Sequence, residues 1–161
     1  MGKSIMIRKF EPADMNQLIR LVKQKCQELG EGIATFDEKQ LIEFIRQVNI
    51  KKGYQIFVSE RSNQIKGYVV CSAYKNPWNG MREGMIHFLY VDPEYRQGFM
   101  AKDLFAQAEQ HFRNCDCQFF NATTRAFDEK YQTKKEFIEQ ADSFYQRVMT
   151  DCGSNYIKEI V

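Results

Sequence analysis

The chain has 161 residues, of which 43% are hydrophobic, 27% are charged, 9 are Gly and 3 are Pro. This length and composition predict one globular domain over residues 1–161 and exclude long disordered or low-complexity segments. Lys and Arg number 23 and Asp and Glu number 21, which gives a net charge of +2. The charges are interspersed and form no basic block, so nucleic acid is not an expected partner.

The cysteine count and the start of the chain indicate the cellular compartment. Five Cys are present, an odd number, and Met1-Gly2-Lys3-Ser4 leads directly into a strand pattern without a signal peptide. No apolar run approaches the roughly 18 residues of a membrane span. A cytoplasmic protein with reduced thiols and no membrane partner is therefore expected. No His or Cys at zinc spacing accompanies the close pair Cys115 and Cys117, so no metal site is predicted.

Hydrophobic periodicity, together with Pro and Gly at element ends, predicts the order of helices and strands. In chain order the expected elements are a strand at 4–10, a helix from Glu11-Pro12 to Gly30, a helix from near Asp37, strands at 54–60, 65–74 and 85–92, a helix from about Met100 to Asn114, a strand at 117–124, a helix near 134–149 and one strand at the end, YIKEIV. The order β-α-α-β-β-β-α-β-α-β predicts an α/β (α+β) fold, with about four helices flanking a mixed, mainly antiparallel central sheet.

The stretch 88–105, FLYVDPEYRQGFMAKDLF, is the most informative part of the sequence. It predicts a strand that leads through a short loop with Pro93 and Arg96 into a helix. The free backbone N–H groups and the positive end of the dipole at a helix start can bind a phosphate, and Arg96 would add its charge. The alternative is an ordinary strand–turn–helix with Arg96 in solvent.

This stretch resembles the acetyl-CoA-binding motif of the GNAT superfamily of N-acetyltransferases, Val-x-Pro-x-x-Arg followed by x-x-Gly-x-Gly/Ala and a helix. The residues that fall in register are Val91, Pro93, Arg96, Ala101 and Leu104. The order of elements is also similar over nearly the whole chain. The resemblance implies that acetyl-CoA is a co-substrate, without a metal. By the same resemblance, the residues that bind it are Leu89, Tyr90, Val91, Arg96, Gln97, Gly98, Phe99, Met100 and Ala101.

Three features depart from the family pattern. Phe99 replaces the first Gly, with Gly98 one position early, and a ring at this point could crowd the pyrophosphate. The family's Gly-Phe near the last helix is missing, and Cys152-Gly153-Ser154 stands there. Only one strand is predicted after that helix, where the family usually has two. The first departure bears on cofactor affinity, and the other two bear on the substrate side.

His87 is the candidate general base. Alternation predicts Met85, His87 and Leu89 on one face of their strand, and the family often carries a carboxylate or His on this strand as base, directly or through water. An imidazole with a pKa near 6.5 suits this role at neutral pH. The alternative is a His that only hydrogen-bonds in a half-buried strand.

Other titratable residues are weaker candidates for the base. Glu83 and Glu94 are predicted in flanking loops, and Met85, where some relatives carry a Glu, cannot take a proton. His111 lies near a helix end, where a cation suits the dipole, so a structural role is expected.

Tyr145 is the candidate acid that protonates the departing thiolate. It follows Phe144 on the last predicted helix, as a Phe-Tyr pair often does in the family. A phenol with a pKa near 10 stays protonated at pH 7 and can donate. The alternative is an aromatic core residue whose hydroxyl reaches water.

The resemblance predicts an N-acetyltransferase in which an amine of a small molecule or protein attacks acetyl-CoA directly in a ternary complex. Cys26 and Cys71 are predicted at buried positions, so no cysteine is placed as an acyl carrier. The alternatives are a non-catalytic acyl-CoA-binding module and a protein-binding domain that presents the Trp78 loop. Tyr54, Trp78 and Tyr131 could line a pocket or pack a core. The sequence leaves a homodimer open.

Overall fold

The computed structural model describes residues 4–29, 36–123, 135–151 and 155–160. The strands are β1 Met6–Lys9, β2 Tyr54–Arg61, β3 Gln64–Lys75, β4 Arg82–Val91, β5 Phe119–Thr123, β6 Thr150–Asp151 and β7 Asn155–Glu159. The helices are α1 Met15–Leu29, α2 Glu38–Ile50, α3 Met100–Asn114 and α4 Lys135–Val148, with 3-10 turns at Pro12–Asp14 and Pro93–Tyr95. The predicted α/β fold class is confirmed, but the prediction of a single strand after the last helix is wrong. The additional strand, β6, has only two residues, which is too short to produce an alternating pattern.

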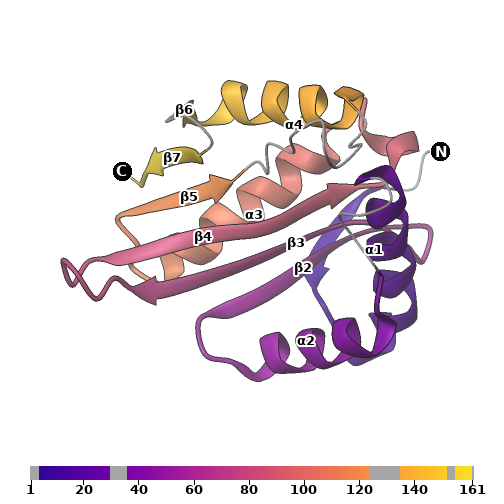
Figure 1. Cartoon of the computed structure of the whole chain (residues 1–161), viewed down its shortest axis with the longest axis horizontal. Coiled ribbons are helices and arrows are strands. Elements are labelled where there is room, and N and C mark those ends of the chain that lie inside the picture. The colour runs from indigo at the N-terminus through magenta and orange to yellow at the C-terminus, as the bar shows by residue number, and fades with distance from the viewer. Residues whose placement is uncertain (1–3, 30–35, 124–134, 152–154, 161) are drawn as a thin grey trace.

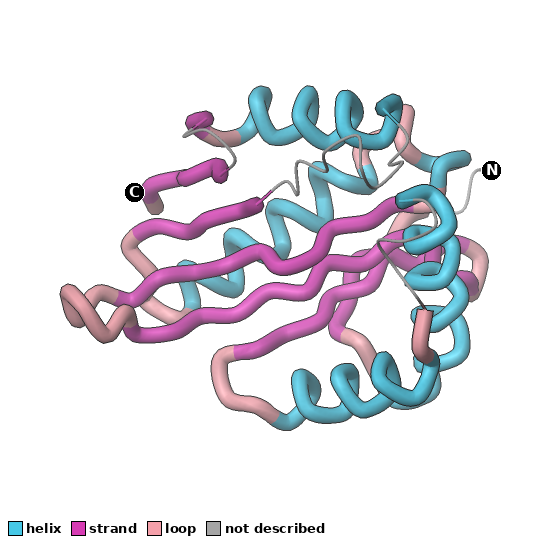
Figure 2. The backbone as a smooth tube through the Cα atoms, viewed as in Figure 1, coloured by secondary structure: helices cyan, strands magenta, loops and turns pink. Residues whose placement is uncertain are grey.

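All the described strands belong to one mixed sheet (Figures 1 and 2). Its order is β1-β2-β3-β4-β5-β7-β6, and every pair is antiparallel except β4 and β5. Helices α1 and α2 cover one face, where Leu18, Leu21 and Ile45 pack with sheet residues. Helices α3 and α4 pack on the opposite face, in a second core that includes Leu104 and Tyr145. The central strands β3 and β4 are therefore buried from both sides.

The helix starts follow local capping chemistry. The predicted first helix begins as a tight 3-10 turn, because the Asp14 carboxylate accepts from Glu11 N at 2.8 Å and pairs with Arg8 at 2.6 Å. The Arg8 guanidinium holds the pKa of this carboxyl below its usual value. At the second helix, which begins near Asp37 as predicted, the Asp37 side chain accepts from Gln40 N at 3.1 Å and caps the helix.

Strand β4 contains a bulge at His87, which positions the candidate site. Val70 pairs with Phe88, whereas the next residue of β3, Cys71, pairs with Ile86, so His87 is an extra residue in β4. The predicted regular alternation through this strand is therefore wrong. His87 and Phe88 both face the side of α1 and α2, and Leu89 packs against the α3 core instead of sharing the face of His87.

Strand β4 also separates from β5 at this bulge. Within the described residues, the parallel ladder runs from Glu83 opposite Phe119 to Ile86 opposite Ala122. Strand β4 continues beyond the ladder to Val91, hydrogen-bonded to β3 alone among the described strands. Among the described residues, the backbone groups on the β5 side of this end of β4 have no strand partner, and Val91 O accepts from Arg96 Nε.

Candidate active site

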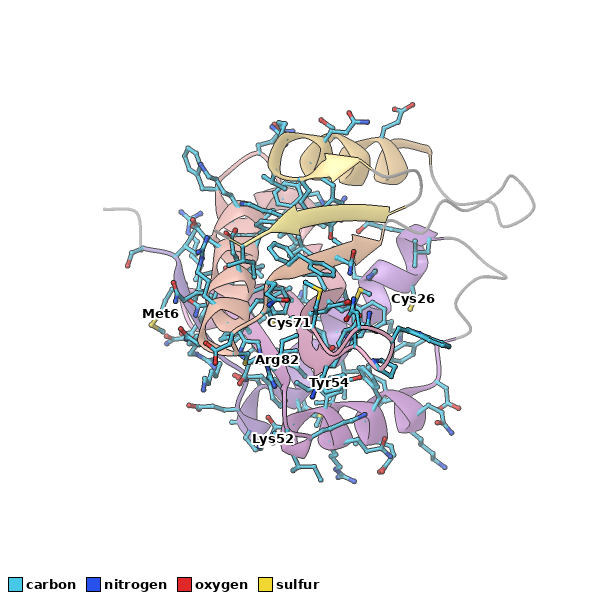
Figure 3. All side chains as sticks on the ribbon, turned by 90° about the vertical axis from the view of Figure 1, so that its left-hand side faces the viewer. Met6, Cys26, Lys52, Tyr54, Cys71 and Arg82 are labelled. Carbon is cyan, nitrogen blue, oxygen red and sulfur yellow. The ribbon has the colours of Figure 1, made fainter. Side chains whose placement is uncertain are left out.

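His87 is held on both sides at the bulge. Its Nε2 lies 2.7 Å from Oγ of Ser72, a residue of β3 that is only 2% exposed. Its ring stacks on Tyr54 of β2, with centroids 5.5 Å apart and planes within 7° of parallel. Tyr54 lies on the sheet face that α2 covers (Figure 3). These two contacts fix the imidazole while much of its surface stays exposed.

The environment of His87 keeps the imidazole neutral. Partial burial lowers its pKa below the ordinary value of 6.5, and the positive charge of Lys51 lowers it further. Lys51 lies at the end of α2, with its Nζ 4.7 Å from the centroid of the Tyr54 ring. A neutral imidazole has one nitrogen that can accept a proton, so His87 is ready to act as a base at pH 7.

The hydrogen bond with Ser72 can form in either tautomer of His87, because a serine hydroxyl both donates and accepts. When Nε2 carries the proton, it donates to Ser72 Oγ, and the lone pair of Nδ1 remains to take a proton from a substrate. Ser72 was not a sequence candidate. The signal that could have found it is its place in the predicted hairpin, since Ser72 pairs directly with Met85, two residues from His87.

The two glutamates considered as bases occupy different surroundings. Glu83 was predicted in a loop, but it lies in β4 and is only 5% exposed. Its carboxylate accepts from the Tyr74 hydroxyl at 3.0 Å and from Asn76 Nδ2 at 2.5 Å, which closes the β3–β4 turn. The loop prediction failed because β4 begins with two polar residues, Arg82 and Glu83, which are nevertheless paired in the sheet. Glu94 is exposed in the turn after β4.

His111 connects α3 to the start of β2. Its Nε2 lies 3.2 Å from the carbonyl oxygen of Gly53, and its ring contacts Phe57 and Phe112 edge-on or tilted. These contacts agree with the structural role expected from the sequence.

The start of α3 forms the other end of the candidate site. The first bond of this helix runs from Asp103 N to Phe99 O, at 2.8 Å. The N–H groups in the first turn of α3, before Asp103, therefore have no partner inside the helix. The positive end of the helix dipole also lies here. This is the geometry that binds phosphate groups through the backbone.

The structure places all the predicted cofactor-binding residues along one continuous path. Leu89, Tyr90 and Val91 end β4, Arg96, Gln97 and Gly98 form the loop, Phe99 is the N-cap of α3, and Met100 and Ala101 begin the helix. Tyr90, Val91 and Met100 are at most 5% exposed. Only the backbone groups of these three residues can therefore reach a ligand.

Phe99, in place of a family glycine, fits its position without backbone strain. Its φ is −91°, which any L residue adopts, and its ring is 73% exposed. A Cβ on Gly98 would meet Tyr95 O at 3.7 Å, an ordinary contact. Neither position of this loop requires glycine.

The Arg96 guanidinium faces α1. Its Nε donates to Val91 O at 2.9 Å, and its two terminal nitrogens donate to the Glu28 carboxylate at 2.8 and 2.7 Å. Glu28 was not a sequence candidate, because it lies 68 residues away on a helix with no motif of its own.

Tyr145 lies in α4 and is 7% exposed. The ring contacts Phe144 with centroids 5.4 Å apart, and the residue belongs to the same core as Val91 and Met100, which flank the loop. The predicted core-facing position is confirmed.

The other aromatic candidates are separated. Trp78 is 93% exposed in the β3–β4 turn, which lies at the opposite end of β4 from the loop before α3. Tyr54 contacts His87. Tyr131 and Cys152-Gly153-Ser154 lie outside the described residues.

The described cysteines, Cys26, Cys71, Cys115 and Cys117, are free thiols. Cys26 belongs to α1 and Cys71 to the middle of the sheet (Figure 3). Burial raises the pKa of Cys71 and raises that of Cys117 to about 11. Within the described ranges, no three His, Cys, Asp or Glu side chains gather as metal ligands. Among the same residues, no helix is long and apolar enough to cross a membrane.

Comparison with known proteins connects this geometry to a family. The family model described as an acetyltransferase (GNAT) domain matches residues 22–150. No curated protein matches the chain.

Solved structures with the same fold are distant in sequence. A ribosomal-protein-alanine N-acetyltransferase from Brucella melitensis is 18% identical, with a TM-score of 0.70 over 96% of this chain and 99% of its own. An aminoglycoside 6'-N-acetyltransferase from Acinetobacter haemolyticus is 16% identical, with a TM-score of 0.71 over 97% and 94%. Glucosamine-6-phosphate N-acetyltransferase from Arabidopsis thaliana is 15% identical, with a TM-score of 0.69 over 94% and 95%. At these identities the likeness concerns the fold.

Proposed function

Because this chain belongs to the GNAT family of acetyltransferases, we propose that it transfers an acetyl group from acetyl-CoA to an amine of a small molecule or protein. The acceptor amine and acetyl-CoA bind together, and the amine attacks directly, without an acyl-enzyme. The free cysteines support this route, since burial raises the pKa of Cys71 and Cys117 and leaves few reactive thiolates there. The catalytic unit is one domain of residues 1–161, and the free thiols are typical of the cytoplasm.

The backbone around the bulge fits the elongated shape of acetyl-CoA. The β5 side of β4 beyond Ile86, which has no strand partner among the described residues, offers backbone groups other than Val91 O to the amide-bearing arm of the co-substrate. The first turn of α3, beginning at Met100, offers N–H groups to the pyrophosphate. The co-substrate supplies an activated acyl thioester. The protein orients this thioester and provides the groups that take up and donate protons.

His87 takes the proton of the attacking amine. As the C–N bond forms and the C–S bond breaks, the amine proton passes to Nδ1 of His87, directly or through a water. In the tautomer that this step requires, Ser72 Oγ accepts a hydrogen bond from Nε2–H, and Tyr54 holds the ring by stacking. The lowered pKa of His87 keeps the imidazole unprotonated at pH 7, but it also makes the imidazole a weaker base.

Tyr145 donates its hydroxyl proton to the leaving sulfur and is reprotonated from solvent, to which His87 releases the amine proton. Its position in the core that contains Val91 and Met100 supports this role, because these residues flank the proposed co-substrate path. A thiol with a pKa of about 8.5 is already a fair leaving group, so the help required from the phenol is modest.

The moderate basicity of His87 favours amines that are partly neutral near pH 7. An α-amino group, with a pKa of about 8, meets this condition better than a lysine side chain at about 10.4. The names of the structural neighbours include an alanine of a ribosomal protein, an aminoglycoside and an amino sugar phosphate. Both protein and small-molecule amines therefore belong in an acceptor screen.

The observation that carries the proposal is the position of His87, in the bulge where β4 leaves β5. The test incubates the protein with acetyl-CoA and a panel of amines, and measures free CoA and acetylated products by mass spectrometry. We expect one acetylated amine for each CoA released. CoA binding without any product would support the non-catalytic module instead, and no binding would contradict both.

A further inference from the structure

The Glu28 carboxylate connects α1 to the proposed co-substrate path. Arg96 donates two hydrogen bonds to it, at 2.8 and 2.7 Å, and the Tyr90 hydroxyl donates a third to Oε1. Figure 1 shows α1 beside the end of β4, where Tyr90 lies. Burial and the Glu28 bond both raise the pKa of Tyr90, so its hydroxyl remains a donor at every physiological pH.

Arg96 extends this connection into the loop before α3. Its Nε donates to Val91 O at 2.9 Å, and its guanidinium lies 5.2 Å from the centroid of the Tyr90 ring. The pair is largely covered, since the side chains of Arg96 and Glu28 are 19% and 16% exposed. A two-point bond between such groups fixes orientation as well as distance, and losing one partner leaves a covered charge uncompensated.

Two roles for Arg96 make opposite predictions about Glu28. If Arg96 binds the pyrophosphate itself, Glu28 competes for the guanidinium and adds repulsion, so neutralising Glu28 would tighten binding. If Arg96 instead fixes the loop through its bond to Val91 O, Glu28 fixes the guanidinium in place, and neutralising Glu28 would weaken CoA binding. The directions of Nε and both terminal nitrogens, toward Val91 O and Glu28, favour the second role.

We propose that Glu28 is a positioning residue for acetyl-CoA binding, which acts through Arg96 to hold the loop between β4 and α3. This inference rests on the proposed function. The backbone N–H groups at the start of α3 point to the pyrophosphate only when the loop has this conformation. The Glu28–Arg96 pair therefore sets cofactor affinity without touching the reacting atoms.

The experiment compares Glu28→Gln with Glu109→Gln as a matched control. The Glu109 side chain is 14% exposed and pairs with Arg113 and Lys158, but it lies about 15 Å along α3 from Phe99. Calorimetry would measure Kd for CoA, and steady-state kinetics would separate KM for acetyl-CoA from kcat. We expect Glu28→Gln to raise both Kd and KM roughly tenfold with kcat nearly unchanged, and Glu109→Gln to lower Tm with Kd unchanged.

Two further variants keep the test decisive. Tyr90→Phe removes one donor to Glu28 but keeps the buried ring, and it should raise Kd roughly twofold to threefold even if Glu28→Gln folds poorly. Arg96→Gln combined with Glu28→Gln should weaken binding no more than either change alone, because both break one contact. Tighter or unchanged CoA binding by Glu28→Gln would overturn the inference. A wild-type protein that binds no CoA would instead overturn the proposed function, and this inference with it.

Discussion

The Oγ of Ser72 lies 2.7 Å from Nε2 of His87 and thereby joins the bulge of β4 to the neighbouring strand β3. Ser72→Ala removes the hydroxyl that, in the proposed mechanism, accepts a hydrogen bond from Nε2–H of His87. We expect kcat to fall roughly threefold to tenfold with KM for acetyl-CoA unchanged, because the Nδ1-protonated tautomer cannot accept the amine proton at that nitrogen. Steady-state kinetics on the variant measures this.

Ser59 provides the matched control for Ser72. It is a fully buried serine of β2 whose hydroxyl has no hydrogen-bond partner in the part of the chain that the structure describes. Ser59→Ala should leave kcat unchanged. Equal losses in the two variants would mean that the effect of Ser72→Ala is general and not tied to His87.

Replacement of His87 tests the general base. His87→Gln, which keeps a polar side chain of similar size, should lower kcat/KM by roughly 10²-fold or more. The protonated imidazole cannot accept a proton, so wild-type activity should fall as pH drops through the pKa of His87. Because burial and Lys51 lower that pKa, the acid limb should have its midpoint below 6.5.

The pH–rate profile of His87→Gln completes this test. The acid limb should disappear in the variant, while Tm should stay close to that of the wild type. A lower Tm with nearly full activity would identify His87 as a structural residue of the bulge.

Periodicity in the sequence was sufficient for most of the fold. The helix predicted from about Met100 to Asn114 has these bounds in the structure, because its apolar face repeats every three to four residues. The N-cap at Asp37 is equally local, since its partner is three residues away. Such features depend on neighbours in the chain, which the sequence displays directly.

The parts that could not be predicted depend on distant partners. Alternation placed Leu89 on the face of His87, but the pairing of Val70 and Cys71 with β4 inserts a bulge that reverses the faces beyond it. Glu28 meets Arg96 across 68 residues, so no spacing rule connects them. The motif thus indicates where the loop is, whereas the contacts that hold it come from packing of α1 on the sheet.

Binding of acetyl-CoA should stabilise the fold. A ligand that binds only the native state adds RT ln(1 + [L]/Kd), which is about 2.7 kcal/mol at a hundredfold excess over Kd. We therefore expect Tm to rise by several degrees at millimolar acetyl-CoA. Inorganic phosphate at the same concentration controls for a general anion effect, and an equal rise with phosphate would contradict specific co-substrate binding.

Phe99 tests the alignment of the loop. Phe99→Gly removes an exposed ring at the N-cap of α3, a position where glycine is well tolerated. Since φ is −91° already, the backbone need not change, and Kd for CoA should stay the same or decrease. Trp78→Gly, which removes an exposed ring from the β3–β4 turn, should leave Kd unchanged. Loss of CoA binding in Phe99→Gly alone would show that the motif is misaligned.

Tyr145 tests the final proton transfer. Tyr145→Phe keeps the buried ring beside Phe144 and removes only the hydroxyl. A thiolate leaves fairly well without help, so we expect kcat to fall only roughly 10–100-fold, at or below the usual range for acid catalysis. Kd for CoA should change little, because the ring packing is retained. Phe144→Leu, which alters the same part of α4 without touching a hydroxyl, controls for packing and should affect Tm more than kcat. An unchanged kcat in a stable Tyr145→Phe variant would exclude the phenol as the acid and leave water as the proton donor.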